Sequence, residues 1–89
     1  MRTETEQLTP REPCGVVRWV LHRHDETITC EVDLRFRRHC LLSVVPAWDA
    51  PAAVFEAFDD PGIALRRHAE MARRLREHGW KLDRRASTF

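Results

Sequence analysis

The sequence contains no tyrosine, no asparagine and a single lysine, whereas arginine occurs fourteen times in 89 residues. Codons for the scarce residues are rich in A and T, so this bias indicates a bacterial, GC-rich coding sequence rather than selection for guanidinium chemistry. No apolar run approaches the roughly 20 residues that span a membrane. Acidic residues stand at the N-terminus where a signal peptide needs an apolar run. We therefore expect a cytoplasmic chain without a membrane segment.

Cysteine is also scarce, and its spacing argues against a disulfide or a metal site. Cys14, Cys30 and Cys40 are odd in number and form no C-x-x-C motif. If Cys40 faces Leu34 on the neighbouring strand, it lies about 13 Å from Cys30, too far for a disulfide or shared zinc ligation. We expect core cysteines in a reducing compartment, with no metal and no cofactor.

Charge is nearly balanced overall but unevenly distributed. Residues 1–62 carry a net charge of −4, and residues 63–89 carry +5. The basic residues of the second part suggest phosphate contacts through Arg66, Arg67, Arg73, Arg74, Lys81, Arg84 and Arg85. Glu70 and Glu77 stand three or four residues from most of the helix arginines. Their negative charge therefore weakens the positive field that would attract phosphate. A solvated helix face is the favoured interpretation, and nucleic-acid binding is the alternative.

Residues 1–13 are polar and aperiodic, so we expect a disordered arm, then one domain over 14–82 and a flexible tail over 83–89.

Three segments of alternating residues predict a small sheet. The first strand turns Val17, Trp19 and Leu21 to one face. The inward residues of the next two strands are, in order, Ile28, Cys30, Val32 and Leu34, then Cys40, Leu42 and Val44.

The requirement that inward residues share one face restricts the first turn. It sets Leu21 opposite Cys30 or Ile28 and Trp19 opposite Val32, which leaves Asp25-Glu26 as a two-residue loop. Residues 46–53 then read as a connector rich in proline and alanine. Val54 to Phe58 forms either a short fourth strand or a segment that lays Phe55 or Phe58 against the core.

The segment from Asp60 to Trp80 predicts an amphipathic helix with a signal at each end. Asp60 is an N-cap before Pro61 in the first turn, and Gly79 suits a left-handed C-terminal cap with Trp80 folded back onto Leu75. A step of about 100° per residue gathers an apolar sector of Ala64, Leu65, His68, Ala69, Met71, Ala72 and Leu75. The fold class is therefore α+β: a three- or four-stranded antiparallel meander with one C-terminal helix on one face, in two layers.

His68 is the one polar residue in the middle of that apolar sector. It is either a buried base or pH switch with a pKa lowered by desolvation, or a core histidine bonded to a strand carbonyl or an indole. The second interpretation is favoured, because no nucleophile or carboxylate can be placed beside it from the sequence. No nucleophile, base and orienting group emerge elsewhere, so we expect no enzyme.

The outward residues of the strands suggest an interaction surface. Val20, Leu41 and Val45 are apolar and point away from the predicted helix. Three strands and a helix bury little surface, and open strand edges invite pairing. We therefore expect a non-enzymatic interaction domain that associates with a second copy or another protein, and nucleic-acid binding is the less favoured alternative.

Overall fold

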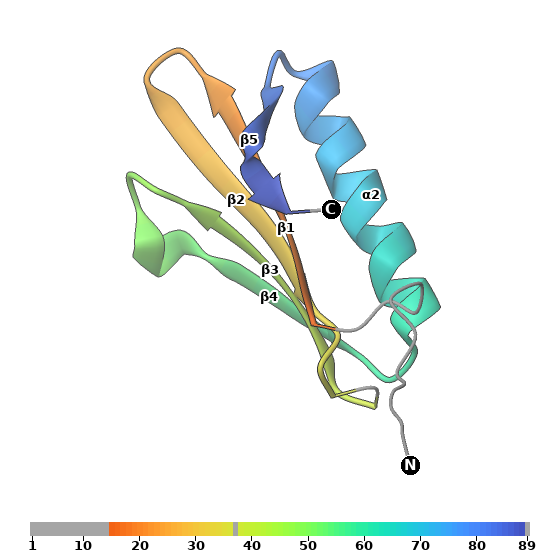
Figure 1. The fold of residues 1–89 in the computed structure, drawn as a ribbon. Coiled ribbons are helices and arrows are strands. Elements are labelled where there is room, and N and C mark those ends of the chain that lie inside the picture. Colours follow the sequence, from red (N-terminus) through yellow and green to blue (C-terminus); the bar gives the residue numbers. More distant parts are fainter. Residues whose placement is uncertain (1–14, 37, 89) are drawn as a thin grey trace.

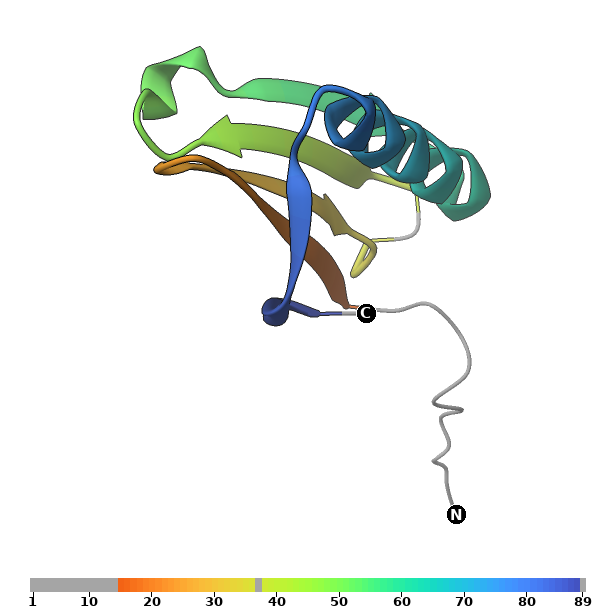
Figure 2. The ribbon, with the colours of Figure 1, turned by 90° about the horizontal axis from the view of Figure 1, so that it is seen from above.

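A computed structural model describes residues 15–36 and 38–88; the predicted arm over 1–13 and Cys14 lie outside them. The chain forms β1 (Val16–Arg23), β2 (Glu26–Asp33), β3 (Cys40–Pro46), the short 3-10 helix η1 (Ala50–Ala52), β4 (Val54–Phe58), α2 (Pro61–Glu77) and β5 (Lys81–Thr88). Figures 1 and 2 show one twisted sheet with α2 lying across one of its faces, so the α+β fold in two layers is confirmed. No helix in the described ranges is long and apolar enough to cross a membrane.

The sheet has five antiparallel strands in the order β4-β3-β2-β1-β5, where the sequence predicted three or four. The optional fourth strand over Val54–Phe58 is present as β4. The fifth strand corrects the prediction of a flexible tail, since residues 83–88 belong to β5. β5 pairs with the outer side of β1, and the pairing is irregular between Arg18, which faces Thr88, and Val20, which faces Asp83.

The register between β1 and β2 differs from the main prediction by two residues, which keeps the same side chains on the inner face. Leu21 faces Ile28, which was one of the two alternatives, but Trp19 faces Cys30 and not Val32. The loop is therefore His24-Asp25 and not Asp25-Glu26. His24 adopts a φ of +56°, a left-handed conformation that residues other than glycine rarely use. That conformation permits the two-residue turn without a glycine.

Both ends of α2 form as the sequence predicts. The Asp60 carboxylate accepts a hydrogen bond from the Ile63 amide at 3.0 Å. At the other end Gly79 has a φ of +92°. The Trp80 amide donates to the Leu75 carbonyl at 3.1 Å and the Gly79 amide donates to the Arg76 carbonyl at 3.1 Å, which is the Schellman pattern.

The core lies between α2 and the face of the sheet that the alternation predicted. Buried residues divide into a cluster around Val32, Leu34, Cys40, Leu42 and Ala64 and a second cluster around Leu21, Ile28, Cys30 and Trp80. α2 contacts β2, β3 and β4. Within the predicted apolar sector of α2, Ala64, His68 and Ala72 are buried but Ala69 is exposed.

Candidate functional site

The two edge strands of the sheet differ in how far they are protected from pairing with another strand. β5 carries Lys81, Arg84 and Arg85, and its register against β1 is interrupted. Charged residues and bulges are the usual means by which an edge strand avoids further pairing. β4 reads Val-Phe-Glu-Ala-Phe, without lysine, arginine or proline and without a register shift against β3. Of the two edges, β4 is the one open to another strand.

β4 also presents apolar side chains on both of its faces. Val54, which pairs with Val44 on the helix side of the sheet, is 50% exposed. Phe55, which pairs with Ser43 on the open side, is 61% exposed. Leu41 lies beside Ala57 on the open side and is 42% exposed. Exposed apolar side chains on either side of an unpaired edge are typical of an interaction site.

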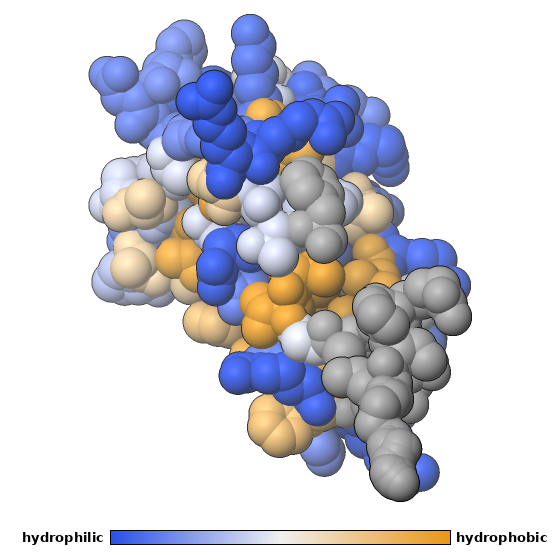
Figure 3. Space-filling view, in the orientation of Figure 1, coloured by the Kyte–Doolittle hydropathy of each residue, from blue (hydrophilic) through white to orange (hydrophobic). Residues whose placement is uncertain are grey.

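Six large apolar residues of the described chain are exposed: Phe36, Leu41, Trp48, Val54, Phe55 and Ile63. Val54 and Phe55 lie on β4 and Leu41 on the neighbouring β3, whereas Trp48 stacks on Trp80 at the end of α2. None of them belongs to β1, β2 or β5. In Figure 3 the surface over the η1 region at the left is pale orange, whereas the top, around the end of α2 and the β1–β2 turn, is blue. The strongest orange in this view lies near its centre, with blue residues directly beside it.

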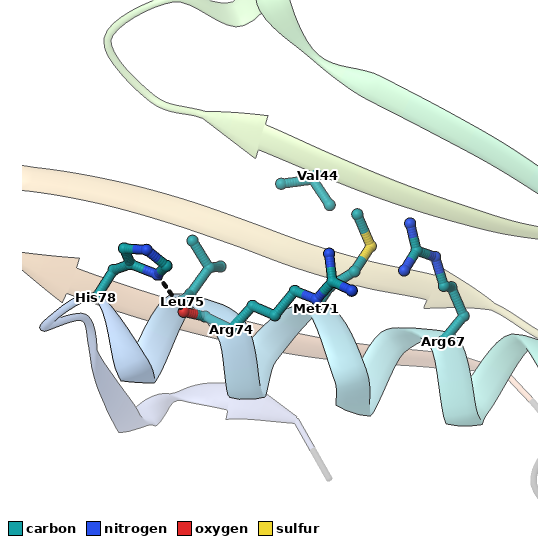
Figure 4. A pocket seen from close by; sticks show the side chains of 6 residues that line it. All are labelled: Val44, Arg67, Met71, Arg74, Leu75 and His78. Atoms are coloured by element: carbon teal, nitrogen blue, oxygen red, sulfur yellow. Dashed lines mark hydrogen bonds between the residues drawn. The ribbon is translucent and has the colours of Figure 1, made fainter.

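A shallow groove of about 220 Å³ runs between α2 and β3 on the β4 side. Figure 4 shows Met71 and Leu75 pointing from α2 toward Val44, with arginine side chains at the rim. The Arg67 guanidinium is bonded to two carboxylates: Nε donates to Glu56 at 3.0 Å and Nη1 donates to Glu70 at 2.8 Å. Because Val54 lies next to Val44, the apolar floor of the groove continues onto β4.

A second hollow, of about 800 Å³, lies where the β1–β2 turn meets the end of α2. It is lined by His22, Arg23, His24, His78, Gly79 and Lys81. Two of these side chains have acidic neighbours, since Nη2 of Arg23 lies 3.6 Å from Glu26 and Nε2 of His22 lies 2.7 Å from Asp83. The adjacent helix C-terminus is the negative end of the helix dipole. The hollow therefore has little net attraction for an anion.

An aromatic stack closes the same end of the core. The Trp48 and Trp80 rings are nearly parallel, with centroids 6.0 Å apart and planes 12° apart. The Arg23 guanidinium carbon lies 4.6 Å from the Trp80 ring centroid, within the range of a cation–π contact. The stack connects the turn after β3, the end of α2 and the end of β1.

His68 is 1% exposed, and its Nε2–H donates to the carbonyl oxygen of Cys30 at 2.8 Å. Its ring contacts that of Trp19, with centroids 4.4 Å apart. Burial lowers the pKa of His68, and the hydrogen bond to Cys30 offsets part of that effect. The interpretation as a core histidine bonded to a strand carbonyl is confirmed. A buried ring nitrogen that donates to a strand carbonyl has a structural role and is not accessible as a base.

The three residues predicted as an association face do not form one patch. Val20 and Val45 both neighbour Thr29 on the open side of the sheet, but Val20 is only 9% exposed. Leu41 lies four residues from Val45 along β3, about 13 Å away, and is the only one of the three beside β4. The sequence missed Val54 and Phe55, because their exposure depends on β4 being an edge, which no local pattern reveals.

The residues predicted to contact phosphate occupy two elements. Arg66, Arg67, Arg73 and Arg74 lie on α2, and Lys81, Arg84 and Arg85 lie on β5. Glutamates neutralise much of the helix charge: Arg73 pairs with Glu77 at 2.8 Å, and Arg74 approaches Glu70 at 3.5 Å. The cross-bracing that the sequence predicted is therefore present on α2, although Arg66 makes no such pair within the part of the chain that the structure describes.

Cys30 and Cys40 are buried in the core, where burial raises the pKa of the Cys30 thiol to about 11. Within residues 15–36 and 38–88, no group of three or more histidine, cysteine or acidic side chains is arranged to hold a metal ion. Comparison of the chain with protein-family models, with curated proteins and with solved structures gave no match. The β4 edge, with Val54 and Phe55 on either side of it, is therefore the candidate site on the evidence of its own geometry.

Proposed function

We propose that this chain is a small, non-enzymatic interaction domain that receives a strand of another polypeptide along β4. The observation that carries the proposal is the contrast between the edges. β5 is irregular in its pairing and basic, whereas β4 is regular and carries the exposed Val54 and Phe55. Backbone groups on an open edge supply hydrogen bonds to an added strand, and flanking side chains supply the apolar contact.

The size of the apolar contact supports a moderate affinity. Burying an exposed valine or phenylalanine side chain contributes about 1.5–3 kcal/mol before the cost of ordering the partner. Phe55 and Val54 lie on opposite faces of β4, so one added strand covers part of both. Removal of one such contact is expected to weaken binding by about tenfold or more.

Two measurements test the proposal with matched variants. Light scattering over a range of concentrations measures self-association, and a display library of extended seven-residue peptides measures binding of other strands. Phe55→Lys should abolish the binding that the unaltered chain shows in either assay. Ala86→Lys, at a position on β5 that is also exposed, should leave it intact. If Phe55→Lys changes neither result, the proposal is wrong.

Nucleic-acid binding through the α2 arginines and β5 remains the alternative prediction. Its favourable feature is that Arg66 on α2 and Lys81 and Arg85 on β5 lack carboxylate partners among the described residues. Phosphate contacts must weaken steeply with salt. Absence of binding to mixed DNA or RNA at low salt would end this alternative.

A further inference from the structure

The sequence of β4 restricts how it can pair with an identical strand. Its helix-side residues are Val54, Glu56 and Phe58, and its open-side residues are Phe55 and Ala57. When two copies pair antiparallel about a two-fold axis perpendicular to the sheet, each residue must face one from the same side. The axis therefore lies midway between one residue and the same residue of the second copy. The central residues that keep most of β4 paired are Phe55, Glu56 and Ala57.

Only the axis through Glu56 pairs all of β4 with all of its copy. It sets Val54 against Phe58 on the helix side and Phe55 against Ala57 on the open side, so that a large ring meets a small neighbour. An axis through Phe55 sets Val54 against Glu56. An axis through Ala57 sets Glu56 against Phe58. Both of these place an apolar side chain opposite a carboxylate.

The remaining difficulty of this register is that Glu56 faces Glu56, since like charges directly opposite each other are destabilising. The structure already compensates that charge. Arg67 binds the carboxylate through two bonds, from Nε at 3.0 Å and from Nη2 at 3.2 Å. These bonds lower the pKa of Glu56. Each Arg67–Glu56 pair carries almost no net charge, so the repulsion between two facing Glu56 carboxylates is reduced.

We infer that the strand received by β4 is β4 of a second copy, paired antiparallel about a two-fold axis at Glu56. Two five-stranded sheets then join into one continuous sheet, with both α2 helices on the same face. The exposed Phe55 of each copy covers Ala57 of the other and approaches the neighbouring Leu41. This inference rests on the proposed function and adds to it the partner and the register.

Disulfide trapping tests the register, because facing residues on adjacent strands have Cβ atoms about 4.5–5.5 Å apart, close to the geometry of a disulfide. In a Cys14→Ser background, Glu56→Cys should form a linked dimer under oxidised glutathione. Phe55→Cys alone should link far more slowly. An equal mixture of Phe55→Cys and Ala57→Cys chains should give the linked heterodimer while Glu56 is retained.

The outcomes separate this inference from the proposed function. Faster linking of Phe55→Cys than of Glu56→Cys places the axis elsewhere and overturns the register, although β4 still pairs. A monomeric mass up to millimolar concentration, together with peptide binding that Phe55→Lys abolishes, overturns the second copy as partner but keeps the edge site. A dimer that survives Phe55→Lys and shows none of the expected links overturns both.

Discussion

His68 in the middle of α2 and Cys30 in the central strand β2 are joined by a hydrogen bond of 2.8 Å that crosses the core. Cys30 is fully buried and His68 nearly so. The bond links the helix to the centre of the sheet. Burial lowers the pKa of the imidazole because it penalises the charged form, and the bond to Cys30 opposes part of that shift.

The neutral state of His68 predicts a dependence of stability on pH. The pKa of His68 in the fold is below its ordinary value, which in an unfolded chain is about 6.5. The unfolded chain therefore binds more protons, and the free energy of unfolding falls as the pH drops below about 6.5 toward the folded pKa. Urea midpoints should be lower at pH 5 than at pH 7.5.

Replacement of the imidazole separates this effect from other titrations. His68→Leu should preserve or raise the melting temperature at pH 7.5 and flatten the change between pH 7.5 and 5. A large loss of stability in His68→Leu would show instead that the hydrogen bond to Cys30 is indispensable.

The N-cap of α2 should account for a measurable part of the stability. Asp60→Ala removes the acceptor of the Ile63 amide and should cost about 1 kcal/mol. Asp59 is also exposed but is not the N-cap, so Asp59→Ala is the matched control and should change little. Urea unfolding of the two variants gives the comparison, and equal losses would contradict the assignment of the cap.

Cys30 should resist alkylation in the folded chain. With a pKa of about 11, about one thiol in a thousand is ionised at pH 8, and only the thiolate is reactive. In a variant that keeps Cys30 as its sole cysteine, modification by iodoacetamide should follow global unfolding and accelerate with urea. Rapid modification without urea would show that the strand opens locally.

Arg67 should control the titration of Glu56. Its hydrogen bonds are the main cause of the lowered pKa of that carboxyl. Arg67→Met should therefore raise the pKa of Glu56 toward its ordinary value, as measured by NMR of the carboxyl carbon. Arg73→Met is the control, because Arg73 pairs with Glu77 and should leave Glu56 unchanged. Both side chains of the Arg67–Glu56 pair are about one-third exposed, so the effect on stability should be small.

The sequence was sufficient where one periodicity or one residue type determines the structure. The alternation through Ile28, Cys30 and Val32 predicted the buried face of β2, and the Asp60, Pro61 and Gly79 signals predicted both ends of α2. The first turn was misplaced because it depends on the positive φ of His24, which a sequence without glycine at that site does not indicate.

The fifth strand and the candidate site were not predictable because both depend on distant pairing. Residues 81–88 contain one large apolar residue, Leu82, and form a strand by pairing with β1. Val20 was expected to be exposed, but it lies between β2 and β5 and its amide donates to the Ser87 hydroxyl at 2.9 Å. The exposure of Phe55 likewise follows from strand order.

The parallel rings of Trp48 and Trp80 also give the molecule an intrinsic spectroscopic probe. With tyrosine absent, near-ultraviolet absorption comes chiefly from three indoles. Two of them lie close enough, at 6.0 Å, for their electronic transitions to couple. The resulting circular dichroism reports whether the turn after β3 remains docked on the end of α2, and it does so without any attached label.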